Sequence, residues 1–167
     1  MRHKVTALIR ADVGAQLTLS VNESRRNLGP DVTVDFIRGQ LLLTRTDQHI
    51  LAAGTLKSAL TAECVRCLEP FRLQLHIHLE ELFVLHPGPR VMDMNYCVDW
   101  NGTIDLTPAL REQVVLVQPI KPVCRPDCKG LCAKCGKNLN EGPCDCGDAS
   151  TDPRLSALKA LLETGGH

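Results

Sequence analysis

The segment ECVRCLEPFRLQLHIHL, residues 63–79, decides the fold of this chain. From Phe71 to Leu79, apolar and polar side chains alternate without interruption. A period of two predicts a strand with one face on a core and the other face in water. Residues 50–60 predict its antiparallel neighbour, and the short connection between the two strands carries Cys64 and Cys67. The segment therefore predicts an antiparallel hairpin with two cysteines at its tip.

Other parts of the first 106 residues also carry strand and turn signals. Apolar and polar side chains alternate over residues 32–36 and predict a further strand. Gly39 and Gly54 interrupt strand patterns, which predicts either β-bulges or close approaches between two backbones. Asn101-Gly102 predicts a hairpin with a type I′ turn, because this pair accepts the positive φ angles that such a turn requires.

Two helices are predicted after the sheet. Thr107-Pro108 and Asp152-Pro153 each place a capping residue before a proline, and apolar side chains follow at helical spacing. Between these helices, residues 121–146 are polar and rich in glycine and proline, so they lack an apolar core of their own.

The predicted fold class is α+β. An antiparallel, curved sheet that could close into a barrel is followed by a helix, a cysteine-rich zinc loop and a C-terminal helix. We expect two units along the chain. Residues 1–120 form the antiparallel-sheet domain with its closing helix, and residues 121–167 form a cysteine-rich zinc-binding module with the C-terminal helix packed on it.

Composition excludes several classes of function. The 167 residues carry 19 basic and 19 acidic side chains, so there is no overall field to attract RNA or an acidic membrane. With three Phe, one Tyr and one Trp, an aromatic platform for stacked bases is not expected. The sequence shows no apolar run of membrane-spanning length and no secretory leader, so we expect a cytoplasmic protein with reduced thiols. Nine cysteines in that setting point to metal binding.

Six of the nine cysteines lie between residues 124 and 146. The zinc site that the spacing predicts most directly consists of Cys132, Cys135, Cys144 and Cys146. Zinc takes four thiolates in a tetrahedron when its site is structural, and Cys-x2-Cys followed by a glycine suits a tight turn beneath the ion. Zinc can order a segment that has no apolar core, because its binding contributes on the order of 10–16 kcal/mol.

A further zinc site could be formed by Cys64, Cys67, Cys124 and Cys128, which would clamp residues 121–146 onto the hairpin tip. Two alternatives stay open for Cys64 and Cys67. They could be half-buried apolar residues at a turn, as free cysteines often are. They could also form a redox pair, although that motif normally opens a helix after a parallel strand.

Basic residues gather beside the cysteines: Arg66, Lys121, Arg125, Lys129, Lys134 and Lys137. They could contact phosphates, with Arg66 and Lys129 as the candidate RNA-binding residues. They could equally stabilise the negative charge of a thiolate cluster. Each zinc ion with four thiolates brings about two negative charges, so local basicity alone does not support RNA binding.

Four motifs in this order resemble the bacterial and plastid YceD family: CVRCLEPF, IDLTPALRE, CRPDCKGLCAKCGKNLNEGPCDC and DPRLSALKAL. The resemblance covers about residues 36–163. It implies a role in the accumulation of large-subunit ribosomal RNA, without a known catalytic activity. The family's motif residues fall on Cys64, Arg66, Cys67, Cys128, Gly130, Leu131, Cys132, Cys135, Gly136, Cys144 and Cys146.

The function that we expect is a non-enzymatic factor that binds precursor ribosomal RNA or the assembling large subunit, and an assembly factor is a further candidate partner. The chain has no P-loop, nucleophile-elbow or dinucleotide-binding motif, which argues against an enzyme. Neither a membrane nor a small-molecule substrate is expected. The alternatives are a zinc-stabilised protein-interaction adaptor without RNA contact and, less favoured, a thiol oxidoreductase that uses Cys64 and Cys67.

Overall fold

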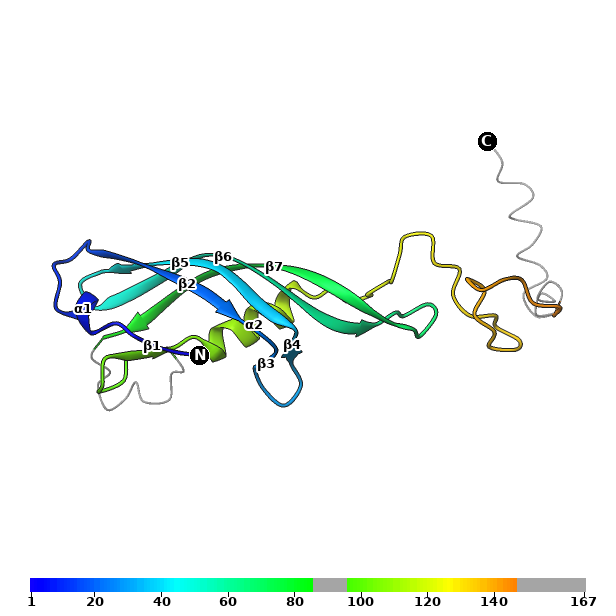
Figure 1. Ribbon diagram of the computed structural model, residues 1–167, viewed down its shortest axis with the longest axis horizontal. Helices are drawn as coiled ribbons and strands as arrows, with labels where there is room; N and C mark the ends of the chain where they lie inside the picture. Colours follow the sequence, from blue (N-terminus) through cyan, green and yellow to red (C-terminus); the bar gives the residue numbers. More distant parts are fainter. Residues whose placement is uncertain (86–95, 147–167) are drawn as a thin grey trace, which may run out of the picture.

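The computed structural model describes residues 1–85 and 96–146 (Figure 1). Its elements in chain order are β1 (Arg2–Lys4), α1 (Thr6–Ile9), β2 (Gln16–Glu23), β3 (Arg26–Asn27), β4 (Thr33–Val34), β5 (Phe36–Arg45), β6 (His49–Glu63), β7 (Pro70–Val84), β8 (Thr103–Asp105) and α2 (Thr107–Val117). The largest sheet has four antiparallel strands in the order β2-β5-β6-β7. Two short ribbons, β1-β8 and β3-β4, flank it.

The predicted hairpin is confirmed as β6 and β7, which pair along 15 residues each. Its register places Leu56 opposite Ile77, and both side chains are fully buried. His76 and His78 lie on the exposed face of β7 between buried neighbours. The alternation of apolar and polar residues therefore correctly predicted which face of β7 lies on the core and which faces solvent.

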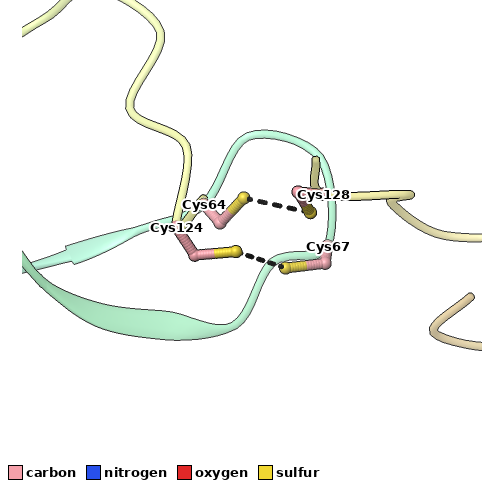
Figure 2. A group of neighbouring side chains, drawn as sticks. All are labelled: Cys64, Cys67, Cys124 and Cys128. Atoms are coloured by element: carbon pink, nitrogen blue, oxygen red, sulfur yellow. Dashed lines mark hydrogen bonds between the residues drawn. The ribbon is translucent and has the colours of Figure 1, made fainter. Parts of the chain in front are cut away.

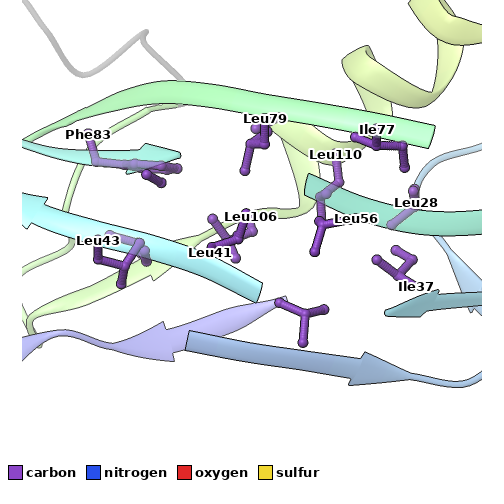
Figure 3. Close-up of a cluster of buried hydrophobic side chains, with 14 of the residues drawn as sticks. Leu28, Ile37, Leu41, Leu43, Leu56, Ile77, Leu79, Phe83, Leu106 and Leu110 are labelled. Carbon is purple, nitrogen blue, oxygen red and sulfur yellow. The ribbon is translucent and has the colours of Figure 1, made fainter. Parts of the chain in front are cut away.

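The sheet does not close into a barrel, so that part of the prediction is wrong. Within the described residues, β2 and β7 are the outer strands and do not pair with each other. Helix α2 lies across the apolar face instead, and its Leu110 packs among Leu56 and Ile77 (Figure 3). Because the helix fills the space that a barrel would enclose, the sheet stays open.

Gly39 and Gly54 mark a close approach between β5 and β6, as one of the two alternatives predicted. The ladder is regular there, with Gly39 opposite Leu56 and Leu41 opposite Gly54. A Cβ atom on Gly39 would lie 2.4 Å from the carbonyl oxygen of Thr55, and one on Gly54 would lie 2.3 Å from that of Gln40. Only glycine lets the two backbones come so close.

The turn at Asn101-Gly102 reverses the chain, but it is not the type I′ turn that was predicted. Gly102 has φ +71°, whereas Asn101 is not among the residues with positive φ. The Asp99 carboxylate accepts hydrogen bonds from the backbone N–H of Asn101 and Thr103, both at 2.9 Å. This side-chain cap favours a different turn, and the following strand β8 pairs with β1.

Helix α2 begins one residue earlier than predicted, because its N-cap precedes Thr107. Leu106 holds the N-cap position, while the Thr107 hydroxyl donates to Asp105 rather than capping the helix. The second predicted helix, from Asp152, lies outside the described residues. In the part of the chain that the structure describes, neither helix is long and apolar enough to cross a bilayer. The division of the chain at residue 120 stays a prediction.

We predict that Gly54→Ala lowers the free energy of unfolding by about 1–3 kcal/mol, because the added methyl group cannot fit against the β5 backbone. Lys57→Ala is the matched control, since Lys57 is exposed on the same strand. Urea unfolding of the two variants measures the difference. Equal midpoints for Gly54→Ala and the wild-type chain would contradict the close packing of β5 on β6.

Candidate metal centres

The first group of four cysteines joins two distant parts of the chain (Figure 2). Cys64 and Cys67 lie on the turn between β6 and β7, and Cys124 and Cys128 lie in the segment after α2. Their four Sγ atoms lie within 4.8 Å of one another. The side chains point towards one another from opposite sides of the turn (Figure 2). We call these residues the first tetrad.

The sulfur positions of the first tetrad fit a tetrahedral metal ion. A zinc–sulfur distance of about 2.3 Å in a regular tetrahedron separates neighbouring sulfurs by about 3.8 Å. The Sγ atoms of Cys64 and Cys128 are 3.9 Å apart, and those of Cys67 and Cys124 are 3.8 Å apart. A disulfide would bring two sulfurs to about 2.05 Å, so neither pair is bonded. The donor set therefore suits an ion that prefers four thiolates.

The second group consists of Cys132, Cys135, Cys144 and Cys146, and its Sγ atoms also lie within 4.8 Å of one another. We call it the second tetrad. It is less buried than the first: Cys135 is exposed and the other three are half-buried. The structure thus groups all eight cysteines as their spacing suggested. Cys97 belongs to neither group.

Each tetrad contains the same backbone turn. In the first, the N–H of Leu68 donates to Cys64 O at 2.9 Å, and the N–H of Cys64 donates to Glu69 O at 3.0 Å. In the second, the equivalent bonds are Gly136 N–H to Cys132 O at 2.9 Å and Cys132 N–H to Lys137 O at 2.9 Å.

The residue after the second cysteine of each turn has a left-handed backbone. Its φ is +59° at Leu68 and +73° at Gly136. Glycine adopts this conformation freely, whereas a leucine there is strained. The glycine turn beneath the second tetrad was predicted, but nothing in the sequence indicated that Leu68 takes the same role.

Backbone contacts fasten the tail to the hairpin tip. Val65 N–H donates to Pro122 O at 2.9 Å, and Leu131 N–H donates to Arg66 O at 3.1 Å. The Arg66 guanidinium donates to the carbonyl oxygens of Pro126 at 3.3 Å and Cys128 at 3.0 Å. Arg66, predicted as an RNA contact, thus orients the chain around the first tetrad. Its side chain is nevertheless exposed.

Lys129, the other candidate RNA contact, lies next to Cys128 and is exposed. Its backbone N–H donates to Asn140 Oδ1 at 2.9 Å. The amide of Asn140 in turn donates to Cys128 Sγ at 3.4 Å. Sequence reasoning missed Asn140, because an asparagine in a polar loop carries no signal that distinguishes it from an ordinary turn residue.

The thiols have shifted pKa values. Burial raises the pKa of the Cys64 thiol, but backbone hydrogen bonds, the largest from Cys124, outweigh burial and lower it to about 6. Burial and neighbouring thiols raise the pKa of Cys124 to about 12. In the second tetrad, the backbone of Cys135 and Lys134 lowers the pKa of Cys132 to about 6. A divalent cation is the group that would favour the thiolate at every sulfur.

A model of the family described as "Large ribosomal RNA subunit accumulation protein YceD" matches residues 52–162. The match includes β6 from Ala52 onward, all of β7 and all eight cysteines of the two tetrads. The chain belongs to the YceD family. This confirms the family that its motifs resemble.

Relatives of this YceD-family chain occur in bacteria and in plants. An uncharacterized protein of Mycobacterium tuberculosis is 34% identical over 128 residues, which cover 73% of this chain and 60% of the relative. "Large ribosomal RNA subunit accumulation protein YCED homolog 1, chloroplastic" of Arabidopsis thaliana is 27% identical, over an alignment that covers 90% of this chain and 54% of the relative.

Uncharacterized protein YlbN of Bacillus subtilis is 28% identical over 110 residues, which cover 65% of this chain and 64% of the relative. The chain therefore spans less than two thirds of the length of each of these relatives. No solved structure matches this YceD-family chain significantly.

We predict that Leu68→Gly is more stable than Leu68→Ala by about 1 kcal/mol, because both remove the side chain but only glycine relieves the left-handed backbone. Denaturant unfolding of the two variants, both loaded with zinc, measures this difference. Conversely, Gly136→Ala should lose about 1 kcal/mol from its φ angle alone, since no atom lies within 4 Å of the added Cβ. Equal stability of the two Leu68 variants would contradict the strained turn.

Proposed function

We propose that this chain is a non-enzymatic, zinc-stabilised factor in ribosome biogenesis. It supports the accumulation of large-subunit (23S) ribosomal RNA by binding precursor ribosomal RNA or the assembling subunit. The observation that carries this proposal is the YceD family match over residues 52–162. The plant relatives bear the same description in their names. We place the protein in the cytoplasm, where its nine thiols would stay reduced.

Zinc is the metal that we propose for both tetrads. Four soft thiolates in a closed set suit zinc, and the sulfur separations in the first tetrad match its tetrahedral geometry. Zinc would supply a structural cross-link here, not a reactive centre. Cys128 and Gly130 are the buried residues of the described tail, so metal binding would provide the free energy that holds this segment in place.

Charge shapes how RNA would be bound. The chain is neutral by residue count, and two filled tetrads would bring it to about −4. Residues 121–146 hold five basic and three acidic side chains, so one filled tetrad cancels their excess of positive charge. RNA binding would therefore depend on individual exposed cations and not on a broad basic field. Arg66 and Lys129, which flank Cys128, are the cations that we propose for this contact.

A protein-interaction adaptor is the second candidate, because apolar side chains are exposed near the tail. Leu116 at the end of α2 is 74% exposed, and Ile120 is 97% exposed. On the hairpin tip, Val65 and Leu68 are also exposed. Such side chains suit a protein partner better than a phosphate backbone.

A thiol oxidoreductase is the least favoured function. The lowered pKa of Cys64, about 6, would suit thiol–disulfide exchange. However, Cys64 is 0% exposed and Cys67 only 4% exposed, so a protein substrate has no access to either sulfur. An insulin-reduction assay without turnover would remove this function from consideration.

We predict that crosslinking in cells, followed by sequencing, recovers large-subunit ribosomal RNA above its share of total RNA. Lys129→Ala should weaken binding to that RNA several-fold and reduce the salt slope of binding by about 1, because one phosphate contact is lost. Lys57→Ala is the matched control, since Lys57 is also an exposed lysine but lies on β6, away from the tail.

Two outcomes would contradict direct RNA binding. RNA recovered only in proportion to its cellular abundance would show non-specific contact. A protein partner that co-purifies after nuclease treatment, with no mobility shift on ribosomal RNA, would support the adaptor instead.

A further inference from the structure

We infer that Asn140 couples the two metal sites, so that metal in the second tetrad raises the metal affinity of the first. The inference rests on the proposed zinc sites and adds a dependence between them. Asn140 lies in the loop between Cys135 and Cys144, both of the second tetrad. Its amide nevertheless contacts a sulfur of the first tetrad, Cys128 Sγ, at 3.4 Å. One loop therefore belongs to both centres.

The Asn140 amide uses all of its hydrogen-bonding capacity in this position. Its Oδ1 accepts from the Arg125 guanidinium at 2.8 Å and from the backbone N–H of Lys129 at 2.9 Å. Its Nδ2 donates to Cys128 Sγ and to Asn138 Oδ1, the latter at 2.8 Å. An amide offers two acceptor positions and two donor hydrogens, and each has a partner here. The Asn140 side chain is thus held in place by four hydrogen bonds and connects the second-tetrad loop to the first tetrad.

The orientation of the amide follows from its partners. Only an oxygen can accept from both the Arg125 guanidinium and the Lys129 N–H, so the amino group must face Cys128. An N–H group directed at a metal-bound thiolate stabilises its negative charge and orients the ligand. Such outer contacts typically change metal affinity about 10- to 100-fold.

The second tetrad controls where this amide lies. Metal at Cys135 and Cys144 would close the loop that carries Asn140, whereas without metal the loop has to be ordered at a cost in conformational entropy. The bond from Leu139 N–H to Gly130 O, at 2.9 Å, ties the same loop to the chain between the tetrads. A filled second site thus holds the Asn140 amide against Cys128 before metal binds to the first site. By linkage, a filled first site favours the second by the same factor.

The test is zinc binding to the full chain, with zinc buffered by a competing chelator. The zinc-dependent change in alkylation of Cys64 and Cys67, measured by mass spectrometry against the chelator-stripped chain, reports the first site alone. The variants are Asn140→Ala, Asn140→Asp and Cys132→Ser with Cys144→Ser, which disables the second site. Asn140→Asp keeps the acceptor oxygens for Arg125 and Lys129 but cannot donate to Cys128. Lys137→Ala is the control within the same loop, because its ammonium contacts Pro143 O and not a sulfur.

We expect disabling the second site to lower the zinc affinity of the first about tenfold, and each Asn140 variant to lower it by a similar factor. Combining Asn140→Ala with the disabled second site should add little further loss, because both changes remove the same contact. Lys137→Ala should leave the first site within about twofold of the wild-type chain.

Three results would overturn the coupling. An unchanged first site in the Asn140 variants would show that the amide contributes nothing to metal binding. Equal affinity with and without the second site would show that the sites fill independently. Full additivity in the combined variant would show that Asn140 acts without the second tetrad. By contrast, alkylation of Cys64 and Cys67 that does not depend on zinc in the wild-type chain would contradict the proposed zinc site itself.

Discussion

The convergence of four sulfurs at the hairpin tip is the constraint on which the tail depends. Cys64 and Cys67 come from a turn of the sheet, and Cys124 and Cys128 come from a polar segment that has no core of its own. A small apolar cluster surrounds them, to which Phe71, Val123 and Leu131 contribute. Hydrophobic burial of this extent is too small to order the tail, and the zinc ion that we propose would supply the remaining free energy.

The four-stranded sheet positions the hairpin tip that carries two of these sulfurs. The long β6–β7 hairpin projects beyond helix α2, towards residues 121–146 (Figure 1). Helix α2 and the buried face of the sheet supply the hydrophobic core, and Leu106 and Leu110 lie among its largest buried side chains. The pairing of β6 with β7 continues to Glu63 and Pro70, next to Cys64 and Cys67, which suits a site whose ligands must hold fixed positions.

Much of this arrangement was predictable because its signals are local. A period of two identified the face that carries Leu56, and the spacing of the cysteines indicated both groups of four. The choice between a closed barrel and a helix-covered sheet depends on long-range packing of α2, which no local pattern encodes. The turn at Asn101-Gly102 was mispredicted because the Asp99 carboxylate satisfies the backbone N–H groups in another way.

The candidate site was less predictable in its supporting contacts. Leu68 takes a left-handed backbone that its residue type disfavours, and the cysteine turn around it imposes that conformation. Asn140 and the Arg66 guanidinium became visible only through their contacts, because each reaches across to another segment. These contacts also affect how the basic residues beside the cysteines are interpreted. A cation that orients thiolates is not by itself evidence for RNA binding.

We propose that eight cysteines hold two metal ions and leave one thiol free. Elemental analysis of the purified chain, combined with a count of reactive thiols under native conditions, tests it most directly. We predict two zinc ions per chain and one reactive thiol, at Cys97, which lies outside both tetrads. Nine freely reactive thiols with no bound metal would contradict the claim.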